Sequence, residues 1–397
     1  MVKIDIFLLL TRRNGIIVSV LPKKIKEFFM FQTELNPAFK ENNVPVVFAT
    51  DDKYFPYLAV TLASLKAHAS PAYCYDLVVL CLGVSQKNKT LLSSMFEEVS
   101  NFSLRFVEMD DFFAGNSFFI DKYLSLSTYS RLFIAQIFAR YQKVIYLDCD
   151  LLINADIREM FDIELGDKLL LCCRDFGFAS GTIRKSPIFG DRYAETKLKI
   201  DNFLDYFNAG VLVFNVQAIR KQGIDKILLE NVKEIEKPLF HDQDILNATC
   251  YRKVVFLPYV WNFIANDVAK LKCLPEDYQK EYELSEKNPK IIHFAGRVKP
   301  WQSKKIPFSS LWWMYARQCP FFERILEDNE ASLYNSGFKV KKYQFKILGF
   351  IVLGHVVVEV KKTTYFWWKI PVLRIKRKDG VVRMSLFGLE LLKIKKM

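Results

Sequence analysis

Two aspartates separated by one residue are the feature of the sequence with the clearest chemical meaning. Asp148 and Asp150 directly follow the apolar segment 143–147. In a strand, residues i and i+2 lie on the same face, so both carboxylates can meet one cation or one diphosphate–metal complex. Carboxylate oxygens suit a hard ion such as Mg²⁺ or Mn²⁺. An Asp-x-Asp triplet also occurs by chance in solvated turns. By itself it therefore does not distinguish a cation site from a solvated turn.

A second group of polar residues follows another apolar strand, within the segment 290–301. His293 offers a neutral imidazole, which Mn²⁺ accepts beside two carboxylates, although a lone histidine after a strand is more often structural. Lys299 could meet a phosphate as a point charge, and Gly296 lets the backbone approach that phosphate closely. Arg131 has two equal interpretations, as a phosphate partner and as an ordinary surface cation.

Acidic residues also end other predicted strands. Asp51 and Asp52 end the segment 44–52, and Asp175 follows the apolar run 168–174. In open α/β sheets, ligands bind at the carboxyl ends of the strands. The positions of these acids therefore predict a binding site at that edge of the sheet.

Amides and acids at two further segments complete the candidate set. Asn208 and Ala209 precede a buried strand, where a side-chain amide can bind a sugar hydroxyl. Asp242, Gln243 and Asp244 lie at a predicted helix start, where acidic residues interact favourably with the helix dipole. For Asp244 we prefer that structural interpretation.

The elements that must position these residues alternate between strand and helix. Strands are predicted at 44–52, 75–84, 104–110, 143–154 and 207–216, and helices at 55–69, 87–100, 127–139 and 219–235. Such alternation is typical of an α/β fold with a mostly parallel sheet. At 397 residues and 51% hydrophobic composition, the chain is long and apolar enough to bury a large core.

The charge of the chain is concentrated at one end. The 57 Lys and Arg exceed the 44 Asp and Glu by a net +13, of which residues 339–397 contribute +12. Nucleic-acid binders usually carry their basic patch on the folded domain, so we expect no nucleic-acid partner. We divide the chain into an N-terminal extension (1–43), a main α/β domain (44–338) and a basic, apolar tail (339–397).

The tail interleaves aromatic and apolar residues with lysine and arginine, as interfacial membrane anchors do. We therefore predict a peripheral protein that docks on an anionic membrane surface, on its cytoplasmic face. The alternative is an ordered β-rich appendage that packs its apolar residues and leaves its cations solvated. Eight scattered cysteines without C-x-x-C spacing agree with a reducing cytoplasm.

Six segments together resemble the family 8 glycosyltransferases, which include bacterial lipopolysaccharide galactosyl- and glucosyltransferases. They occur in the family's order across roughly residues 44–305, at 46–65, 127–132, 144–153, 206–216, 241–247 and 291–301. The resemblance implies a single GT-A-type nucleotide-sugar-binding α/β domain, followed here by the C-terminal appendage.

The resemblance also implies a role for each candidate residue. It implies that the metal ligands, holding Mn²⁺ or Mg²⁺, are Asp148, Asp150 and His293. Donor binding would involve Ala49, Asp51 and Tyr54 at the uridine, with Asp52 nearby, Arg131, Asn208 and Ala209 at the sugar, and Gly296 and Lys299 at the diphosphate. The residues near the reacting carbon would be Gln243, Asp242 and Asp175.

We therefore expect retaining, metal-dependent transfer of galactose or glucose from a UDP-hexose to a glycan or lipid-linked glycan acceptor, in lipopolysaccharide or other surface-glycan assembly. Because Gln243 is an amide and not a carboxylate, we favour same-face attack over double displacement. One rival is a haloacid-dehalogenase-like phosphatase, which is disfavoured by Leu152 four positions after the first aspartate. Another is a membrane-peripheral carbohydrate-binding protein without turnover, although every acid of the motifs is present.

Overall fold

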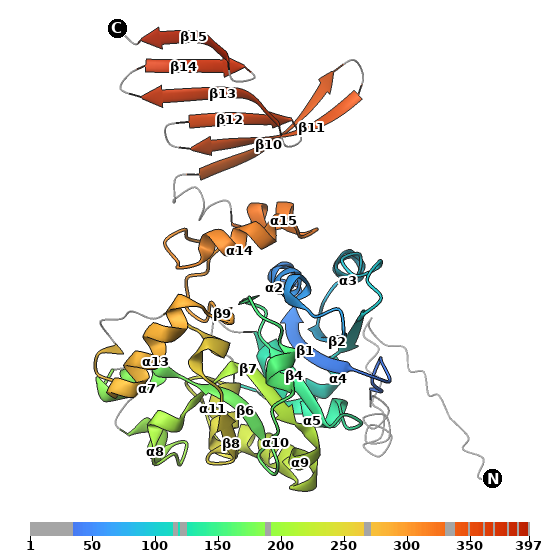
Figure 1. The fold of residues 1–397 in the computed structure, drawn as a ribbon, viewed down its shortest axis with the longest axis vertical. Coiled ribbons are helices and arrows are strands. Elements are labelled where there is room, and N and C mark those ends of the chain that lie inside the picture. The colour runs from blue at the N-terminus through green and yellow to red at the C-terminus, as the bar shows by residue number, and fades with distance from the viewer. Residues whose placement is uncertain are drawn as a thin grey trace, which may run out of the picture.

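A computed structural model describes residues 35–113, 118–119, 125–186, 192–265 and 271–329, and the backbone of six strands between 338 and 395 (Figure 1). Most of the predicted N-terminal extension therefore lies outside the described residues. All eight cysteines are free thiols.

The core of the main domain is a seven-stranded sheet with the strand order β3-β2-β1-β4-β7-β6-β8. Its strands are β1 (Asn43–Asp51), β2 (Cys74–Leu82), β3 (Phe102–Glu108), β4 (Lys143–Leu147), β6 (Leu170–Arg174), β7 (Phe207–Asn215) and β8 (Val254–Phe256). The predicted, mostly parallel sheet is confirmed, with one exception. Strand β7 runs antiparallel to both of its neighbours, β4 and β6.

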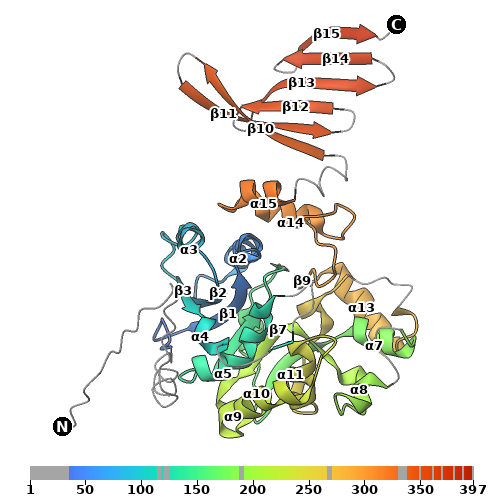
Figure 2. The same ribbon diagram turned by 180° about the vertical axis from the view of Figure 1, so that it is seen from behind.

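Helices cover both faces of this sheet (Figures 1 and 2). Along β1, Val46 and Phe48 join one hydrophobic cluster, while Val47 and Ala49 join the other, as expected for a strand buried on both faces. The first cluster includes residues of α2 (Phe55–His68), α14 (Ser309–Ala316) and α15 (Phe322–Asp328). The second includes residues of α9 (Val216–Lys221), α10 (Ile224–Glu234) and α11 (Asp242–Cys250).

One predicted helix is shorter than expected, because the segment 87–100 is helical only as α3 (Gln86–Ser93). Two further predicted helices differ in their geometry. Residues 127–139 were expected to form one helix, but they form a 3₁₀-helix, η1 (Leu126–Phe133), followed by the short α5 (Ile134–Ile137). The helix predicted at 219–235 is divided into α9 and α10 by Gly223, whose φ of 68° lies in the left-handed region that glycine adopts readily. Both differences arise from local backbone geometry that hydrophobic periodicity does not report.

A two-stranded sheet joins the two segments that carry the predicted metal ligands. Strands β5 (Leu151–Ile153) and β9 (Ile291–His293) pair antiparallel, with Leu151 opposite His293. Because Asp150 immediately precedes β5, this register brings the second aspartate beside the histidine. The single strand predicted at 143–154 is therefore wrong: β4 ends at Leu147, the chain bends, and β5 begins a second sheet at Leu151.

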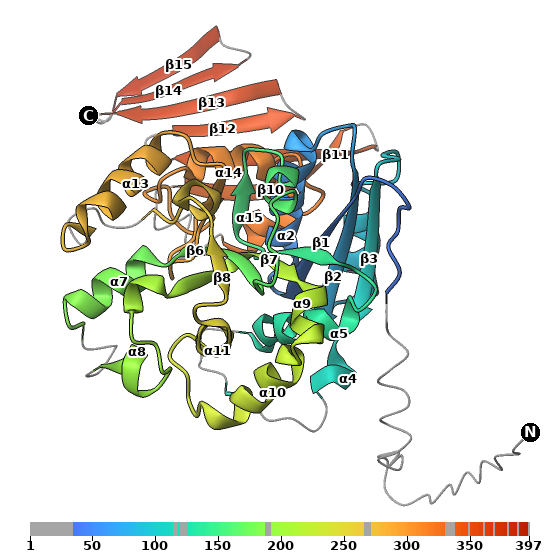
Figure 3. The same cartoon turned by 60° about the horizontal axis from the view of Figure 1, so that its bottom comes forward.

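The remaining elements connect this framework, and Figure 3 labels α4, α7, α8 and α13 among them. They are α3 (Gln86–Ser93), α4 (Asp110–Phe113), α6 (Arg158–Phe161), α7 (Phe176–Ile183), α8 (Tyr193–Thr196), η2 (Phe203–Asp205), η3 (Tyr259–Asn262) and α13 (Glu276–Lys287).

The tail forms a separate six-stranded sheet in which each strand pairs antiparallel with the next in sequence. Its strands are β10 (Phe338–Ile347), β11 (Phe350–Glu359), β12 (Lys362–Trp367), β13 (Ile370–Lys378), β14 (Val381–Leu386) and β15 (Leu389–Lys395). The strands agree with the β-rich interpretation of the tail. Among the described residues, no helix has the length and apolar character needed to span a bilayer.

Candidate active site

The predicted site residues converge on a cavity of about 540 Å³ at the carboxyl end of β1 and β4. Every one of them except Asp51 and Asp52 lines this cavity. Since β7 is antiparallel, the start of this strand reaches the same edge of the sheet. Asn208 and Ala209, expected before the strand, are the second and third residues of β7. The reversal of β7 explains why they lie with residues that follow other strands.

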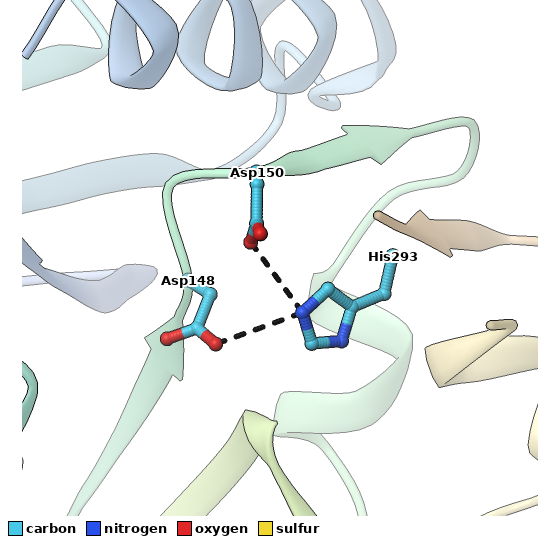
Figure 4. Close-up of side chains that lie close together, drawn as sticks. All are labelled: Asp148, Asp150 and His293. Atoms are coloured by element: carbon cyan, nitrogen blue, oxygen red, sulfur yellow. Dashed lines mark ion pairs between the residues drawn. The ribbon is translucent and has the colours of Figure 1, made fainter. Parts of the chain in front are cut away.

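Asp148, Asp150 and His293 form a compact group of potential metal ligands (Figure 4). The His293 Nε2 atom lies 3.6 Å from Asp148 Oδ2 and 3.4 Å from Asp150 Oδ1. One ligand atom from each residue lies within 4.8 Å of the others. Two carboxylates and an imidazole suit Mn²⁺ or Mg²⁺ in this donor set, so the residues fit the metal that the sequence predicted.

Lys299 supplies a positive charge at the same site. Its Nζ donates to Asp150 Oδ2 and to the Phe294 carbonyl, each at 2.6 Å, and the side chain is buried. Burial alone would raise the pKa of Asp150, but the Lys299 ammonium and the His293 imidazole outweigh burial and hold this pKa below its usual range. Asp150 is therefore a carboxylate, ready to bind a cation.

Arg131 is a buried residue of the site, so the interpretation of this residue as a surface cation is wrong. Its Nη2 lies 3.0 Å from Asp148 Oδ1, and its Nε lies 2.9 Å from Asp242 Oδ2. The guanidinium also lies over the ring of Tyr146, 4.3 Å from the ring centroid. Tyr146 in turn donates its hydroxyl to Asp148 Oδ1 at 2.8 Å. These contacts fix one oxygen of Asp148 and leave the other toward His293.

Asp242 is a buried acid with an unusual affinity for protons. Burial raises its pKa to about 6, with a contribution from the nearby Asp148 carboxylate, although Arg131 opposes the shift. Asp242 begins α11, and only 4% of its surface is exposed. Its charge at neutral pH therefore depends on Arg131.

Gln243, Asn208 and Asp175 share one hydrogen-bond network. The Gln243 Oε1 atom accepts from Ala209 N at 2.9 Å and from Asn208 Nδ2 at 3.2 Å. Gln243 Nε2 donates to Asp175 Oδ2 at 3.2 Å and to the Tyr206 hydroxyl at the same distance. Asp175 also caps α7 by accepting from Phe178 N. The Gln243 oxygen is thus occupied by donors of its own chain.

Asp244 lies below this network and not in the cavity. It accepts from the hydroxyls of Tyr206 and Tyr193, at 2.6 and 2.7 Å, and from Phe240 N at 2.8 Å. Burial raises its pKa, and these donors oppose the shift. These contacts are consistent with the structural role that we preferred for Asp244 from the sequence. They are hydrogen bonds to specific donors and not only an interaction with the helix dipole.

Asp51 and Asp52 hold the turn after β1 and do not line the cavity. Asp51 Oδ1 accepts from Tyr54 N at 2.9 Å, and Tyr54 itself lines the cavity. Asp52 Oδ1 accepts from Ser85 N at 2.9 Å and from Asn88 Nδ2 at 2.6 Å. Their predicted contact with the uridine remains a prediction.

Gly210 is a site residue that the sequence argument missed. A Cβ atom there would lie 2.8 Å from Asp148 Oδ2 and 2.8 Å from His293 Nδ1, and closer still to His293 Cε1. The glycine is therefore required by the close approach of Asp148 and His293, two of the candidate metal ligands. Its place directly after Asn208 and Ala209 was the available signal. Tyr146 was also missed. Its place two residues before Asp148, the spacing of one strand face, was the available signal.

The fold and site together describe an α/β protein with a candidate carboxylate–histidine metal site at the carboxyl edge of its sheet. Residues 45–305 match the family described as "Glycosyl transferase family 8", so the chain belongs to this glycosyltransferase family. The family and the GT-A-like α/β fold predicted from the sequence are confirmed.

Curated relatives agree with this assignment. A Haemophilus influenzae protein named as a glycosyltransferase is 29% identical over 263 residues, which are 65% of this chain and 73% of that protein. General stress protein A of Bacillus subtilis is 27% identical over 289 residues, which are 70% of this chain and 94% of that protein.

Solved structures share the fold. The apo structure of the bifunctional glycosyltransferase WbbM is 32% identical with a TM-score of 0.67; the match covers 74% of this chain but only 53% of WbbM, about half its length. The galactosyltransferase LgtC in complex with donor and acceptor sugar analogs is 26% identical with a TM-score of 0.58, covering 70% of this chain and 96% of LgtC.

Proposed function

We propose that the protein transfers a hexose, galactose or glucose, from a UDP-sugar to a glycan acceptor with retention of the anomeric configuration, and that it requires Mn²⁺ or Mg²⁺. The observation that carries this proposal is the group of Asp148, Asp150 and His293 at the wall of a cavity that Gln243 and Asn208 also line. The likeness to LgtC, whose structure contains donor and acceptor sugar analogs, supports a nucleotide-sugar donor.

Each group of residues has a task in this proposal. Asp148, Asp150 and His293 would hold the metal, which when bound supplies a Lewis acid that neutralises the leaving diphosphate. Lys299 is already charged and buried beside Asp150, so it can bind the same diphosphate. Arg131 keeps Asp148 oriented by binding the oxygen that faces away from His293.

The hydrogen bonds at the reacting face favour same-face attack. A double displacement needs an uncommitted oxygen nucleophile near the anomeric carbon. Gln243 Oε1 accepts from Ala209 N and Asn208 Nδ2, and Asp242 is paired with Arg131. Asp175 accepts from Phe178 N and Gln243 Nε2. We infer that these groups orient the donor sugar and that the acceptor hydroxyl attacks from the face of the departing phosphate.

A donor panel tests this function. The purified protein is incubated with UDP-galactose, UDP-glucose, UDP-N-acetylglucosamine and GDP-mannose, with and without Mn²⁺, together with a set of simple glycosides as acceptors, and nucleotide release is measured. We expect release of UDP from one UDP-hexose, only with metal, and an α linkage in the NMR spectrum of the product. Metal-independent release, or a β-linked product from an α-linked donor, would contradict the proposal.

We also propose that the C-terminal sheet docks the enzyme on an anionic bilayer, where a lipid-linked acceptor would lie. The strand register supports this. One end of the sheet is closed by three apolar pairs: Ile347 opposite Phe350, Trp367 opposite Ile370 and Leu386 opposite Leu389. The opposite end is closed by pairs that contain charged residues, Glu359 with Lys362 and Lys378 with Val381.

A row of cations crosses the same sheet. Lys362 is opposite Lys376, Lys376 is opposite Arg383, and Arg383 is opposite Lys393. Like charges directly opposite each other destabilise a sheet, so anionic lipid would relieve this repulsion. Arg383 lies three residues from the apolar end at Leu386, roughly 10 Å along the strand. With the apolar end at a depth of about 5–10 Å, Arg383 would reach the headgroups.

Liposome co-sedimentation of the full chain tests this docking, with phosphatidylglycerol-containing and neutral vesicles at low and high salt. We expect binding to anionic vesicles at low salt and its loss in the double variant Trp367→Ser, Leu386→Ser. The control Val381→Ser removes an apolar residue from the opposite end and should bind normally. Equal binding by both variants, or no binding by the wild type, would contradict the proposed docking through the C-terminal sheet.

A further inference from the structure

Asn262 is a fully buried amide directly behind the metal-ligand group. It is the last residue of η3, and none of its surface is exposed. The next residue, Phe263, donates its N–H to the Ile291 carbonyl at 2.9 Å and accepts from His293 N at 2.8 Å. These backbone bonds fix η3 against β9. The Asn262 side chain is therefore held beside the His293 ring.

The Asn262 amide joins the metal site to the proposed donor-sugar contacts. Its Oδ1 lies 2.9 Å from His293 Nδ1, and its Nδ2 donates to Asn208 Oδ1 at 2.9 Å. Asn208 Nδ2 in turn donates to Gln243 Oε1 and Asp175 Oδ2. One buried amide thus contacts both a metal ligand and the network that includes Gln243.

Backbone donors determine which way these amides face. The Gly210 N–H donates at 2.9 Å to the Asn208 side chain, so the atom it meets must be the oxygen, Oδ1. Asn262 must then offer Nδ2 to that oxygen, which leaves its own Oδ1 toward His293. Because this oxygen can only accept, His293 Nδ1 must carry a proton. In the neutral ring, Nε2 is then unprotonated.

We propose that Asn262 is a positioning residue that fixes the Nδ1–H tautomer of His293 and thereby presents a lone pair on Nε2 to the metal. The inference rests on the proposed metal dependence. Nε2 faces Asp148 Oδ2 at 3.6 Å and Asp150 Oδ1 at 3.4 Å. Without Asn262 the ring is free to adopt the Nε2–H tautomer, whose proton would interact with these carboxylates and occupy the direction that a metal needs.

Metal affinity gives the first test. Binding of Mn²⁺ without donor is measured by electron paramagnetic resonance for the wild type, Asn262→Leu and Asn215→Leu. Asn215 is a matched control because it is also buried, caps α9 and bonds to the carbonyls of Gly166 and Lys168, away from the site. We expect Asn262→Leu to bind Mn²⁺ about 10–100-fold more weakly, as is common when the partner of a metal-binding histidine is lost. Asn215→Leu should bind as the wild type does.

The tautomer itself gives a second test that needs neither metal nor activity. The chain contains only four histidines, so ¹⁵N-histidine labelling gives a simple two-bond ¹⁵N–¹H spectrum, in which His293→Ala identifies the His293 signals. We expect Nδ1–H in the metal-free wild type and a shift toward Nε2–H in Asn262→Leu.

The outcomes separate the inference from the function on which it rests. An Nε2–H tautomer in the wild type, or wild-type Mn²⁺ affinity in folded Asn262→Leu, would overturn the role of Asn262 alone. A wild type with the Nδ1–H tautomer that binds neither Mn²⁺ nor Mg²⁺ would overturn the proposed metal dependence, and with it the purpose assigned to that tautomer.

Discussion

The site of the catalytic domain is formed by residues far apart in the sequence, whereas the C-terminal sheet is formed by strands that follow each other in the sequence. In the site, Lys299 bonds to Asp150 across 149 positions of sequence, and Arg131 bonds to the Ala209 carbonyl across 78. In the C-terminal sheet, every strand pairs with its neighbour in sequence, and only two residues separate successive strands.

This difference predicts how far the effect of a substitution should extend in each region. A polar site assembled from distant segments depends on the whole domain, because each side chain is oriented by partners from other elements. A sheet of successive hairpins needs only local information to form its pairs. We therefore expect substitutions in the site to affect several of its residues, and changes in the C-terminal sheet to leave the site intact.

The largest effect is expected for Asp150→Asn. A neutral amide cannot balance the charge of a divalent cation, and it also leaves the buried Lys299 ammonium without its carboxylate. Turnover of the UDP-sugar should fall by at least about 100-fold while the fold is retained. The control Asp201→Asn removes an exposed acid, paired with Arg252, and should have little effect. Turnover near the wild-type level in saturating Mn²⁺ would show that the metal site is assigned to the wrong residues.

The next largest effect is a pH dependence of the stability of the catalytic domain. The Asp242 pKa is about 6 in the folded protein against an ordinary value of 3.8, which corresponds to about 3 kcal/mol. Between pH 4 and 6 the folded state binds more protons at this residue than the unfolded state does. The contribution of Asp242 to the free energy of unfolding should therefore fall as the pH rises through this range.

Urea unfolding of the metal-free wild type and of Asp242→Asn from pH 4 to 7 measures this contribution. The stability of the wild type relative to the variant should decrease with rising pH. A constant difference would mean that the pKa of Asp242 is not raised.

Gly210→Ala tests how tightly the distant segments are packed. The added methyl group would collide with His293 and approach Asp148 Oδ2, so the two ligands must separate. We expect Mn²⁺ affinity to fall by about tenfold or more, with a smaller change in thermal stability. Titration with Mn²⁺ measures the affinity, and a thermal melting curve measures the stability, for the variant and the wild type. An unchanged affinity would refute the claim that the glycine is required.

The smallest effect is expected from removal of the C-terminal sheet. A chain ending at Gly337 lacks all six strands but keeps every residue that lines the cavity. Hydrolysis of the UDP-sugar in solution should change by less than about twofold, because the sheet is paired only within itself. A large loss of hydrolysis would mean that the two regions depend on each other and that the contrast between them is wrong.

Strand periodicity and family motifs were sufficient to find much of the site. Asp148 and Asp150 were found as an acidic pair directly after an apolar strand, and His293 was found from its motif. The reason given for the pair was wrong, because residues 148–150 form a bend between β4 and β5 and not one strand face. Asn262 could not be found in this way, because its segment has no motif and its role exists only through the contact of η3 with β9. Gly210 lies within a recognised segment, but only the close approach of two side chains makes it necessary.

The order of strands and helices, the acidic ends of the strands and the basic character of the tail were all readable from residue types and spacing, because each depends on neighbours in the chain. The reversal of β7, the burial of Arg131 between two acids and the orientation of the His293 ring were decided by tertiary structure. Direction, burial and tautomer depend on which distant groups meet in space, and the local pattern does not contain that information.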